Sequence, residues 1–283
     1  MSDDIAYLVS IAPQFLILSM AALAQSLMTG YAGITFVASA AFMGLGAYTS
    51  AILSLQYKMP LLLSAPIAVI VTAVSGVIVS VSLKNIRKDY LAIGTLGLGL
   101  ILNEVYLNWE SVTNGALGIT GIPDIPGQNV ILTISLICTL AIVLLLTRSS
   151  FGNLIRAIRD DEILVQSLGK STFLPRTAVY AVSFAFLGLA GAYFGHYLTQ
   201  VDPTSFGLND SIAILTIVII GGIENPFGAI LGAAVFVYLP AILKLWGLPP
   251  DLAAQARTGL FGLILIVIMM FRPQGLLGSY RIK

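Results

Sequence analysis

The chain has 283 residues, of which 58% are hydrophobic and 10% are charged. Because soluble domains carry about 25% charged residues, this composition excludes an ordinary soluble protein and predicts an integral membrane protein with a single domain over residues 1–283. The net charge of +1 comes from short clusters that form no basic face, which argues against nucleic-acid binding.

The first part of the chain predicts two membrane crossings. No charged residue lies between Asp4 and Lys58, and one crossing needs about 20 residues. The sequence GYAG, residues 30–33, marks the expected break between the two helices. The charged residues ahead of the first crossing are Asp3 and Asp4. A cleavable signal peptide carries basic residues there, so we expect this span to be retained.

Further spans follow from the gaps between charged residues. These apolar stretches are residues 59–83, 90–107, 130–147, 177–198, 212–222, 228–246 and 258–271. Together they predict an all-α polytopic transmembrane helix bundle of about nine spans, within a range of about eight to ten. The stretch 212–222 is short for a crossing at about 1.5 Å per residue, so we expect it to be lengthened by its flanks or broken. The G-x-x-x-G spacing at residues 191–195 predicts close helix packing.

The positions of Lys and Arg orient the bundle. With about nine crossings, the basic clusters in residues 84–88, 148–176 and 272–283 fall on one side of the membrane. The positive-inside rule makes this side cytoplasmic, which places the N-terminus outside and the C-terminus in the cytoplasm. The loops at 108–129 and 199–210 then lie outside.

The charged island at residues 148–176 predicts a short amphipathic helix outside the bilayer. Its apolar residues recur at helical spacing and are Phe151, Leu154, Ile155, Ile158, Val165 and Leu168. The charged residues between them are Arg156, Arg159, Asp160, Asp161 and Glu162. Gly169 is the expected end of the helix. Because nothing else in the chain could supply energy, we interpret the island as the attachment point of an external motor.

Two interrupted apolar stretches have the character of broken helices. The polar residues that interrupt the first stretch are Tyr31, Thr35, Ser39, Tyr48 and Thr49, and the first four of them could line a solute path. We expect Gly44 and Gly46 to let its helix bend. The second stretch, GGIENP, forms a tight turn around Glu224 that would face the cytoplasm and support the docking site.

Glu104 is an ionisable residue inside a predicted span, near its outer end and beside Asn103. One hypothesis is that Asn103 and Glu104 line the solute path. The alternative is a glutamate that reaches the outer water, with Trp109 as an interface anchor. The sequence leaves both interpretations open.

Catalytic motifs are absent from the sequence. The run GKST, residues 169–172, resembles the end of a phosphate-binding loop, but Leu164 occupies the position of the required first glycine. His196 is the single histidine, which argues against a His-rich metal site or a His-based triad. The single cysteine, Cys138, excludes an intrachain disulfide and is expected in the packed core. We therefore expect no catalysis and no bound metal or cofactor.

Taken in order, these motifs resemble the permease subunits of branched-chain amino acid ABC transporters, the LivH/LivM family, and within it the LivM-like branch. The matching segments run nearly from end to end: GYAGITFVASAAFMGLGAYTSAIL, IRKDYLAIGTLGLGLIL, TNGALGITGIP, SFGNLIRAIRDDEILVQSLG, AVSFAFLGLAGAYFGHYL, DPTSFGLNDSIAILTIVIIGGIENPFGAILGA and MMFRPQGLLG. Their order and spacing carry the resemblance.

The resemblance implies a permease subunit of an ABC importer for branched-chain or similar small amino acids, in a bacterial or archaeal inner (plasma) membrane. Its partners would be two ATP-binding subunits, a second permease subunit of the LivH type, and a periplasmic or lipid-anchored solute-binding protein. ATP and Mg would be bound by the ATPase subunits, with no cofactor on this chain.

The resemblance also implies that residues 149–175 contain the family's coupling helix. The residues that match the family stretch are Arg156, Arg159, Asp160, Asp161, Glu162 and Gly169. The charged residues would meet the ATPase and the apolar face would pack on it. ATP binding and hydrolysis would then swing this helix, tilt the spans and release the solute inward.

Departures from the family pattern leave the solute open. Leu100 stands where many relatives carry a glutamate, Asn103 lies near a usual basic position, Ala116 replaces a frequent proline, and Lys170 replaces an apolar residue. Relatives of the same build move urea, short amides, nucleosides or aromatic acids.

Two other classes remain as alternatives. A stand-alone channel or ion-coupled carrier should show paired intramembrane carboxylates or a repeated filter, which the sequence lacks. A membrane-embedded enzyme would have only Glu104 and His196 to work with.

Overall fold

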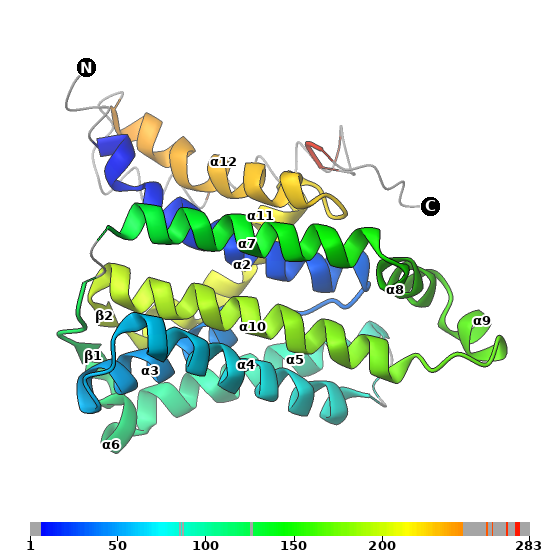
Figure 1. Cartoon of the computed structure of the whole chain (residues 1–283), viewed down its shortest axis with the longest axis horizontal. Helices are drawn as coiled ribbons and strands as arrows, with labels where there is room; N and C mark the ends of the chain where they lie inside the picture. The colour runs from blue at the N-terminus through cyan, green and yellow to red at the C-terminus, as the bar shows by residue number, and fades with distance from the viewer. Residues whose placement is uncertain are drawn as a thin grey trace.

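The structure is a computed structural model that describes residues 7–84, 86, 88–124, 127–245, 259, 262, 270 and 275–277. Its long helices lie side by side in one bundle (Figure 1), which confirms the predicted all-α architecture. They are α2 (Ala12–Gln25), which continues as the π-helix η1 (Ser26–Tyr31), α3 (Ser39–Gln56), α4 (Leu61–Leu83), α5 (Lys88–Asn108), α7 (Gln128–Arg148), α10 (Phe173–Leu198), α11 (Leu208–Gly221) and α12 (Pro226–Leu245).

Short elements lie at the two ends of the bundle. They are α6 (Glu110–Thr113), the 3-10 helices η2 (Gly115–Leu117) and η3 (Pro203–Phe206), the strands β1 (Ile119–Thr120) and β2 (Gln200–Val201), and the helices α8 (Ser150–Asp160) and α9 (Glu162–Ser167). The strands pair antiparallel, with Ile119 opposite Val201. Figure 1 shows α6, β1 and β2 at one end and α8 and α9 projecting from the other, so the predicted outer loops and the charged island lie at opposite ends.

Among the described residues, five helical stretches are long and apolar enough to cross a membrane: Ala12–Tyr31, Leu61–Leu83, Tyr90–Asn108, Gln128–Arg148 and Phe173–Leu198. The pair Leu208–Gly221 and Pro226–Ile242, bent by 120° at its break, would be a sixth if it forms one span. The expected count of about nine also includes α3, separate crossings by α11 and α12, and the stretch 258–271. That last stretch lies largely outside the described residues.

Helices α2 and α10 form the centre of the bundle. Their most apolar windows are 72% and 67% buried, against 17% for α5 and 28% for α7. Phe184 and Leu187 of α10 are fully buried, whereas Ile101 of α5 and Leu145 of α7 are exposed. Large apolar side chains on peripheral helices suit contact with lipid. Cys138 is also exposed, so its expected place in the core is wrong, because α7 is a peripheral helix.

Glycines allow α10 to approach α3 closely. A Cβ on Gly191 would overlap the carbonyl group of Met43, and a Cβ on Gly46 would overlap the backbone of Gly188. The close packing predicted at residues 191–195 is therefore confirmed. Helix α3 continues without a break through Gly44 and Gly46, and both glycines are points of close contact with neighbouring segments.

The predicted break at residues 30–33 is present. The π-helix ends at Tyr31, and residues 32–38 are not helical. The buried side chain of Gln25 supports this segment: its Nε2 donates to the carbonyl of Phe36 over 2.8 Å, and its Oε1 accepts from the hydroxyl of Ser39.

Hydroxyl groups on neighbouring helices complete this support. The backbone N–H of Val37 donates to Thr95 Oγ1 of α5 over 3.2 Å, and that of Ala40 donates to Ser211 Oγ of α11 over 3.1 Å. These side chains satisfy backbone groups that the broken helix leaves open, which is the condition for irregular backbone at membrane depth.

Candidate functional site

Two helices, α8 and α9, form the segment that projects from the bundle, which we call the projecting segment (residues 149–175). The sequence predicts one amphipathic helix here. The structure has two, because Asp161 adopts an extended conformation (φ −150°, ψ 100°). Its carboxylate accepts from the N–H of Leu164 over 3.0 Å and so caps α9. Gly169, with φ +75°, follows the end of α9 and confirms the predicted stop.

The break at Asp161 also divides the apolar stripe. The stripe residues that face the bundle are Ile155, Ile158 and Val165, which are buried, and Phe151 and Leu154, which are half-buried. The expectation that the apolar face would pack on the ATPase therefore does not hold for these five residues, because they pack on the bundle. Leu168 is 72% exposed and does not share their face. The periodicity assumed a continuous helix, and the change of direction at Asp161 turns Leu168 outward.

Three large apolar side chains are exposed at α9. Ile163 and Leu164, in the first turn of α9, are 80% and 57% exposed, and Leu168, directly after its last residue, is 72% exposed. We call these three residues the α9 surface. Clusters of exposed apolar side chains on an extramembrane element are typical of protein contacts.

Arg159 turns inward and joins α8 to two other parts of the chain. Its Nη1 donates to the carbonyl of Gly30 and to Glu224 Oε1, each over 2.6 Å. Only 12% of the Arg159 side chain and 11% of the Glu224 side chain are exposed. Burial lowers the pKa of Arg159, but hydrogen bonds and charge attraction from Glu224 and Asp160 outweigh it, so the pKa lies above its usual value. The guanidinium therefore stays charged.

The backbone around the break fits this arginine closely. Gly33 has φ +65°, and a Cβ there would overlap the Cγ of Arg159. A Cβ on Gly30 would overlap the carbonyl oxygen of Ile223, next to Glu224. The glycines of the GYAG sequence thus allow the first span, the arginine and the Glu224 turn to meet.

Arg156 adds a second, looser contact in the same place. Its guanidinium lies 5.1 Å from the centre of the Tyr31 ring, within the range of a cation–π interaction. Its Nε is 3.8 Å from Glu224 Oε1. Both arginines of α8 therefore face Glu224, and the sequence-based expectation that they point toward a partner protein describes only part of their contacts.

The Glu224 turn is itself held in place. It lies between α11, which ends at Gly221, and α12, and the chain bends there as predicted. Leu276 and Leu277 donate their backbone N–H groups to the carbonyls of Ile220 and Gly221, and Asn225 Nδ2 donates to the carbonyl of Leu277 over 3.0 Å. The turn is a fixed support for the projecting segment.

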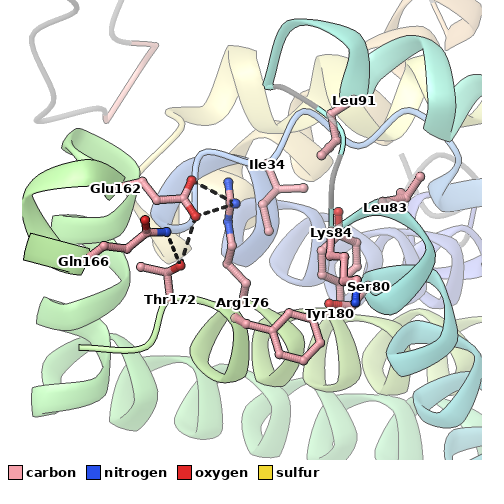
Figure 2. A pocket seen from close by; sticks show the side chains of 11 residues that line it. Ile34, Ser80, Leu83, Lys84, Leu91, Glu162, Gln166, Thr172, Arg176 and Tyr180 are labelled. Carbon is pink, nitrogen blue, oxygen red and sulfur yellow. Dashed lines mark hydrogen bonds and ion pairs between the residues drawn. The ribbon is translucent and has the colours of Figure 1, made fainter. Parts of the chain in front are cut away.

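A separate cluster joins α9 to α10. Glu162 Oε1 accepts from Thr172 Oγ1 and from Arg176 Nη1, each over 3.0 Å, and Gln166 Nε2 donates to Thr172 Oγ1 over 3.1 Å. Figure 2 shows Glu162 and Gln166 reaching from α9 toward these partners. Of the residues predicted to meet a partner, Glu162 is thus engaged internally, while Asp160 and Asp161 are exposed.

The four residues of the interrupted stretch that were predicted to line a solute path have different surroundings. Tyr31 is buried beside Arg156, at the end with the projecting segment. Tyr48 is buried and stacks on Tyr106 with the ring centres 4.8 Å apart. Ser39 is buried against Gln25, and Thr35 is exposed. The structure therefore does not bring this set together.

Asn103 and Glu104 point in different directions. Asn103 Nδ2 donates to the carbonyl of Pro203 over 2.9 Å, whereas Glu104 is exposed and accepts from Asn108 Nδ2 over 3.0 Å. Trp109 is 53% exposed on the same end. This arrangement favours the interpretation that Glu104 reaches outward beside an interface aromatic.

A buried polar network around His196 was missed by sequence reasoning. The ring is 2% exposed; Nε2 lies 3.1 Å from Ser50 Oγ and 3.3 Å from Ser54 Oγ, and Nδ1 lies 2.8 Å from the carbonyl of Pro123. The network extends to α4, because the hydroxyl of Ser64 lies 2.9 Å from Ser50 Oγ and 3.4 Å from Ser54 Oγ. Within the described ranges, no group of three or more His, Cys, Asp or Glu residues could hold a metal ion.

Comparisons with known proteins agree with this architecture. The family model described as "Branched-chain amino acid transport system / permease component" matches residues 7–270. The chain is 29% identical over 306 residues to the high-affinity branched-chain amino acid transport system permease protein LivM of Salmonella typhimurium strain LT2 and to that of Escherichia coli K12, covering 96% of this chain and 70% of each relative.

More distant relatives include other permeases. The chain is 25% identical over 222 residues to the autoinducer 2 import system permease protein LsrC of Salmonella typhimurium strain LT2, covering 74% of this chain and 62% of the relative. No solved structure matches the chain significantly.

Proposed function

Because the chain belongs to the permease-component family of branched-chain amino acid transport systems, we propose that it is the translocating subunit of an ATP-driven importer for branched-chain or similar small amino acids. The family and the apolar helices make it a multi-pass membrane permease. The import direction, the energy source and the solute are our proposal, supported by the likeness to LivM proteins over nearly the whole chain.

The observation that carries this proposal is the projecting segment. It stands outside the bundle (Figure 1), presents the α9 surface outward, and is tied inward by Arg159 and Glu162. An element with one free face and one anchored face can receive force from a partner and pass it to the spans. We assign the partner as an ATP-binding subunit in the cytoplasm, which agrees with the excess of Lys and Arg at this end.

The contacts define how a movement of the segment would reach the spans. Arg159 bonds to Gly30 at the end of the first span and to Glu224 between α11 and α12. Glu162 bonds to Arg176 near the start of α10, the central helix. A shift of α8 and α9 would therefore act on α2, α10 and the α11–α12 pair together, which suits alternating access by tilting of packed helices.

The proposed assembly contains two ATP-binding subunits, a second permease subunit of the LivH type, and a solute-binding protein on the outer side. ATP and Mg belong to the ATP-binding subunits. The N-terminus then lies outside and the C-terminus in the cytoplasm. The alternative solutes are urea, short amides, nucleosides and aromatic acids.

A tagged form of the chain, purified from gently solubilised membranes and analysed by mass spectrometry, tests the assembly. We expect ATP-binding subunits and a second permease to co-purify. Recovery of the chain alone, in a detergent that preserves comparable complexes, would favour a stand-alone channel or carrier.

A further inference from the structure

A cavity of about 310 Å³ lies at the end of the bundle where α9 meets α4 and α10 (Figure 2). This volume falls at the lower end of the range for small-molecule sites, about 300 to 1,000 Å³. Ile34, Leu83, Leu91 and Phe173 give it an apolar wall. Lys84, Glu162, Arg176 and Tyr180 add charged and polar groups to its lining.

Two polar atoms in the lining are buried and have no hydrogen-bond partner among the residues that the structure describes. One is the hydroxyl of Tyr180, a residue that is 4% exposed, and the other is Nε of Arg176. Another nitrogen of the same guanidinium, Nη1, donates to Glu162 Oε1 over 3.0 Å. Buried polar groups are nearly always paired in folded proteins, so two unpaired donors on neighbouring lining residues indicate a missing acceptor.

The charges of the lining narrow the chemistry of that acceptor. Lys84 and Arg176 are cationic and Glu162 is anionic. A phosphate would meet the carboxylate of Glu162 at close range and be repelled, whereas a ligand with one positive and one negative group matches both signs. The apolar wall suits an aliphatic side chain on the same ligand.

We propose that this cavity binds a zwitterionic amino acid with an apolar side chain. Its carboxylate meets Tyr180, Arg176 Nε and Lys84, and its ammonium group meets Glu162. The inference rests on the proposed function for the identity of the amino acid and for its arrival from the cytoplasm. Since Glu162 and Arg176 also join α9 to α10, bound amino acid would alter that joint, and imported product would slow further import.

The test is equilibrium binding of radiolabelled L-leucine to the purified full-length chain in detergent. The informative variants are Tyr180→Phe, which removes only the open hydroxyl, and Lys84→Gln. Ser183→Ala is the matched control, because Ser183 is one turn away on α10 and also carries a buried unpaired hydroxyl, but it does not line the cavity. We expect each cavity variant to weaken leucine binding about tenfold, with Ser183→Ala unchanged.

Competition with leucine analogues tests the zwitterion assignment. Isoamylamine, which lacks the carboxylate, and 4-methylpentanoate, which lacks the ammonium group, should each compete at least about tenfold less well than leucine. Leucine binding that is equal in Tyr180→Phe, Lys84→Gln and the wild type would overturn the inference, as would inorganic phosphate competing as well as leucine.

Amino acid uptake by membranes that contain the whole transporter separates this inference from the proposed function. If the wild type and Tyr180→Phe both take up amino acid and internal leucine slows neither, the proposed function is supported and the regulatory role of the cavity is contradicted. Absence of amino acid uptake would remove the proposed function itself.

Discussion

Arg159 and Glu224 form a 2.6 Å ion pair between segments that are 65 residues apart in the chain. One partner lies on a helix outside the bundle, and the other lies in the turn between two helices of the bundle. The same arginine Nη1 bonds to the carbonyl of Gly30. Three segments that could move separately are therefore joined at one side chain.

Arg159→Gln should destabilise the chain by about 2 to 3 kcal/mol, because Glu224 and the carbonyl of Gly30 lose a charged donor in a largely buried site. Thermal unfolding of the purified chain in detergent measures this. Asp160→Asn is the control. Asp160 also pairs with Arg159, but its side chain is 59% exposed, so removing this ion pair should lower the free energy of unfolding by less than about 1 kcal/mol. Equal effects of the two variants would contradict the assignment of Glu224 as the main partner.

The contribution of Arg159 should not change between pH 6.5 and 9. Its folded-state pKa is raised above the usual value of an arginine, so the stability it provides is fully present below the unfolded-state pKa and is lost only when the pH rises through the folded-state pKa. The difference in unfolding temperature between wild type and Arg159→Gln should thus be constant over this range. A difference that shrinks toward pH 9 would show that another group controls the pair.

Arg159→Glu should uncouple transport while the spans stay inserted, because it places a like charge against Glu224. We expect solute-stimulated ATP hydrolysis of the purified complex to fall about tenfold or more. A complex that retains its ATPase content and its stimulated hydrolysis would show that α8 does not transmit the movement.

Replacing Ile163 and Leu164 by serine should weaken binding of the ATP-binding subunits about tenfold or more, since exposed apolar anchors dominate protein interfaces. Both side chains are more than half exposed, so folding should be unaffected. Co-purification at increasing salt and detergent measures the loss. Lys170→Gln, an exposed change on the same segment, should leave the complex intact. If the double variant recovers as much of the ATP-binding subunits as the wild type does, the α9 surface lies outside the interface with these subunits.

Gly191→Leu should prevent α10 from approaching α3 and cost about 3 kcal/mol or more, because even a Cβ there overlaps the carbonyl of Met43. Gly97→Leu is the matched control, since a Cβ on Gly97 of α5 meets no atom within 4 Å. Thermal unfolding should separate the two variants clearly, and similar unfolding temperatures would contradict the packing described.

Sequence patterns predicted the features that depend on local chemistry. The composition and the apolar runs predicted the helical bundle. The glycines at residues 30–33 predicted the break in the first stretch, and Gly169 predicted the end of the amphipathic helix. Each of these depends on a few neighbouring residues, so it can be recognised without the tertiary fold.

The features that sequence reasoning missed depend on distant partners. Helical periodicity assigns Arg159 to a face of α8, but it cannot show that the long side chain reaches Glu224 and Gly30. The support of the broken helix by Gln25 is hidden for the same reason, since an isolated glutamine in an apolar run carries no sign of its acceptor, the carbonyl of Phe36. Leu168 was misplaced because one extended residue, Asp161, resets the helical phase.

The most direct test of the proposed function is uptake of radiolabelled L-leucine by proteoliposomes that contain the purified complex and its solute-binding protein. ATP is supplied on the side that bears the ATP-binding subunits, and a non-hydrolysable analogue serves as the control. We predict accumulation that requires ATP hydrolysis and that Arg159→Glu abolishes. Leucine equilibration at the same rate without ATP would contradict the proposal and identify a passive channel or carrier.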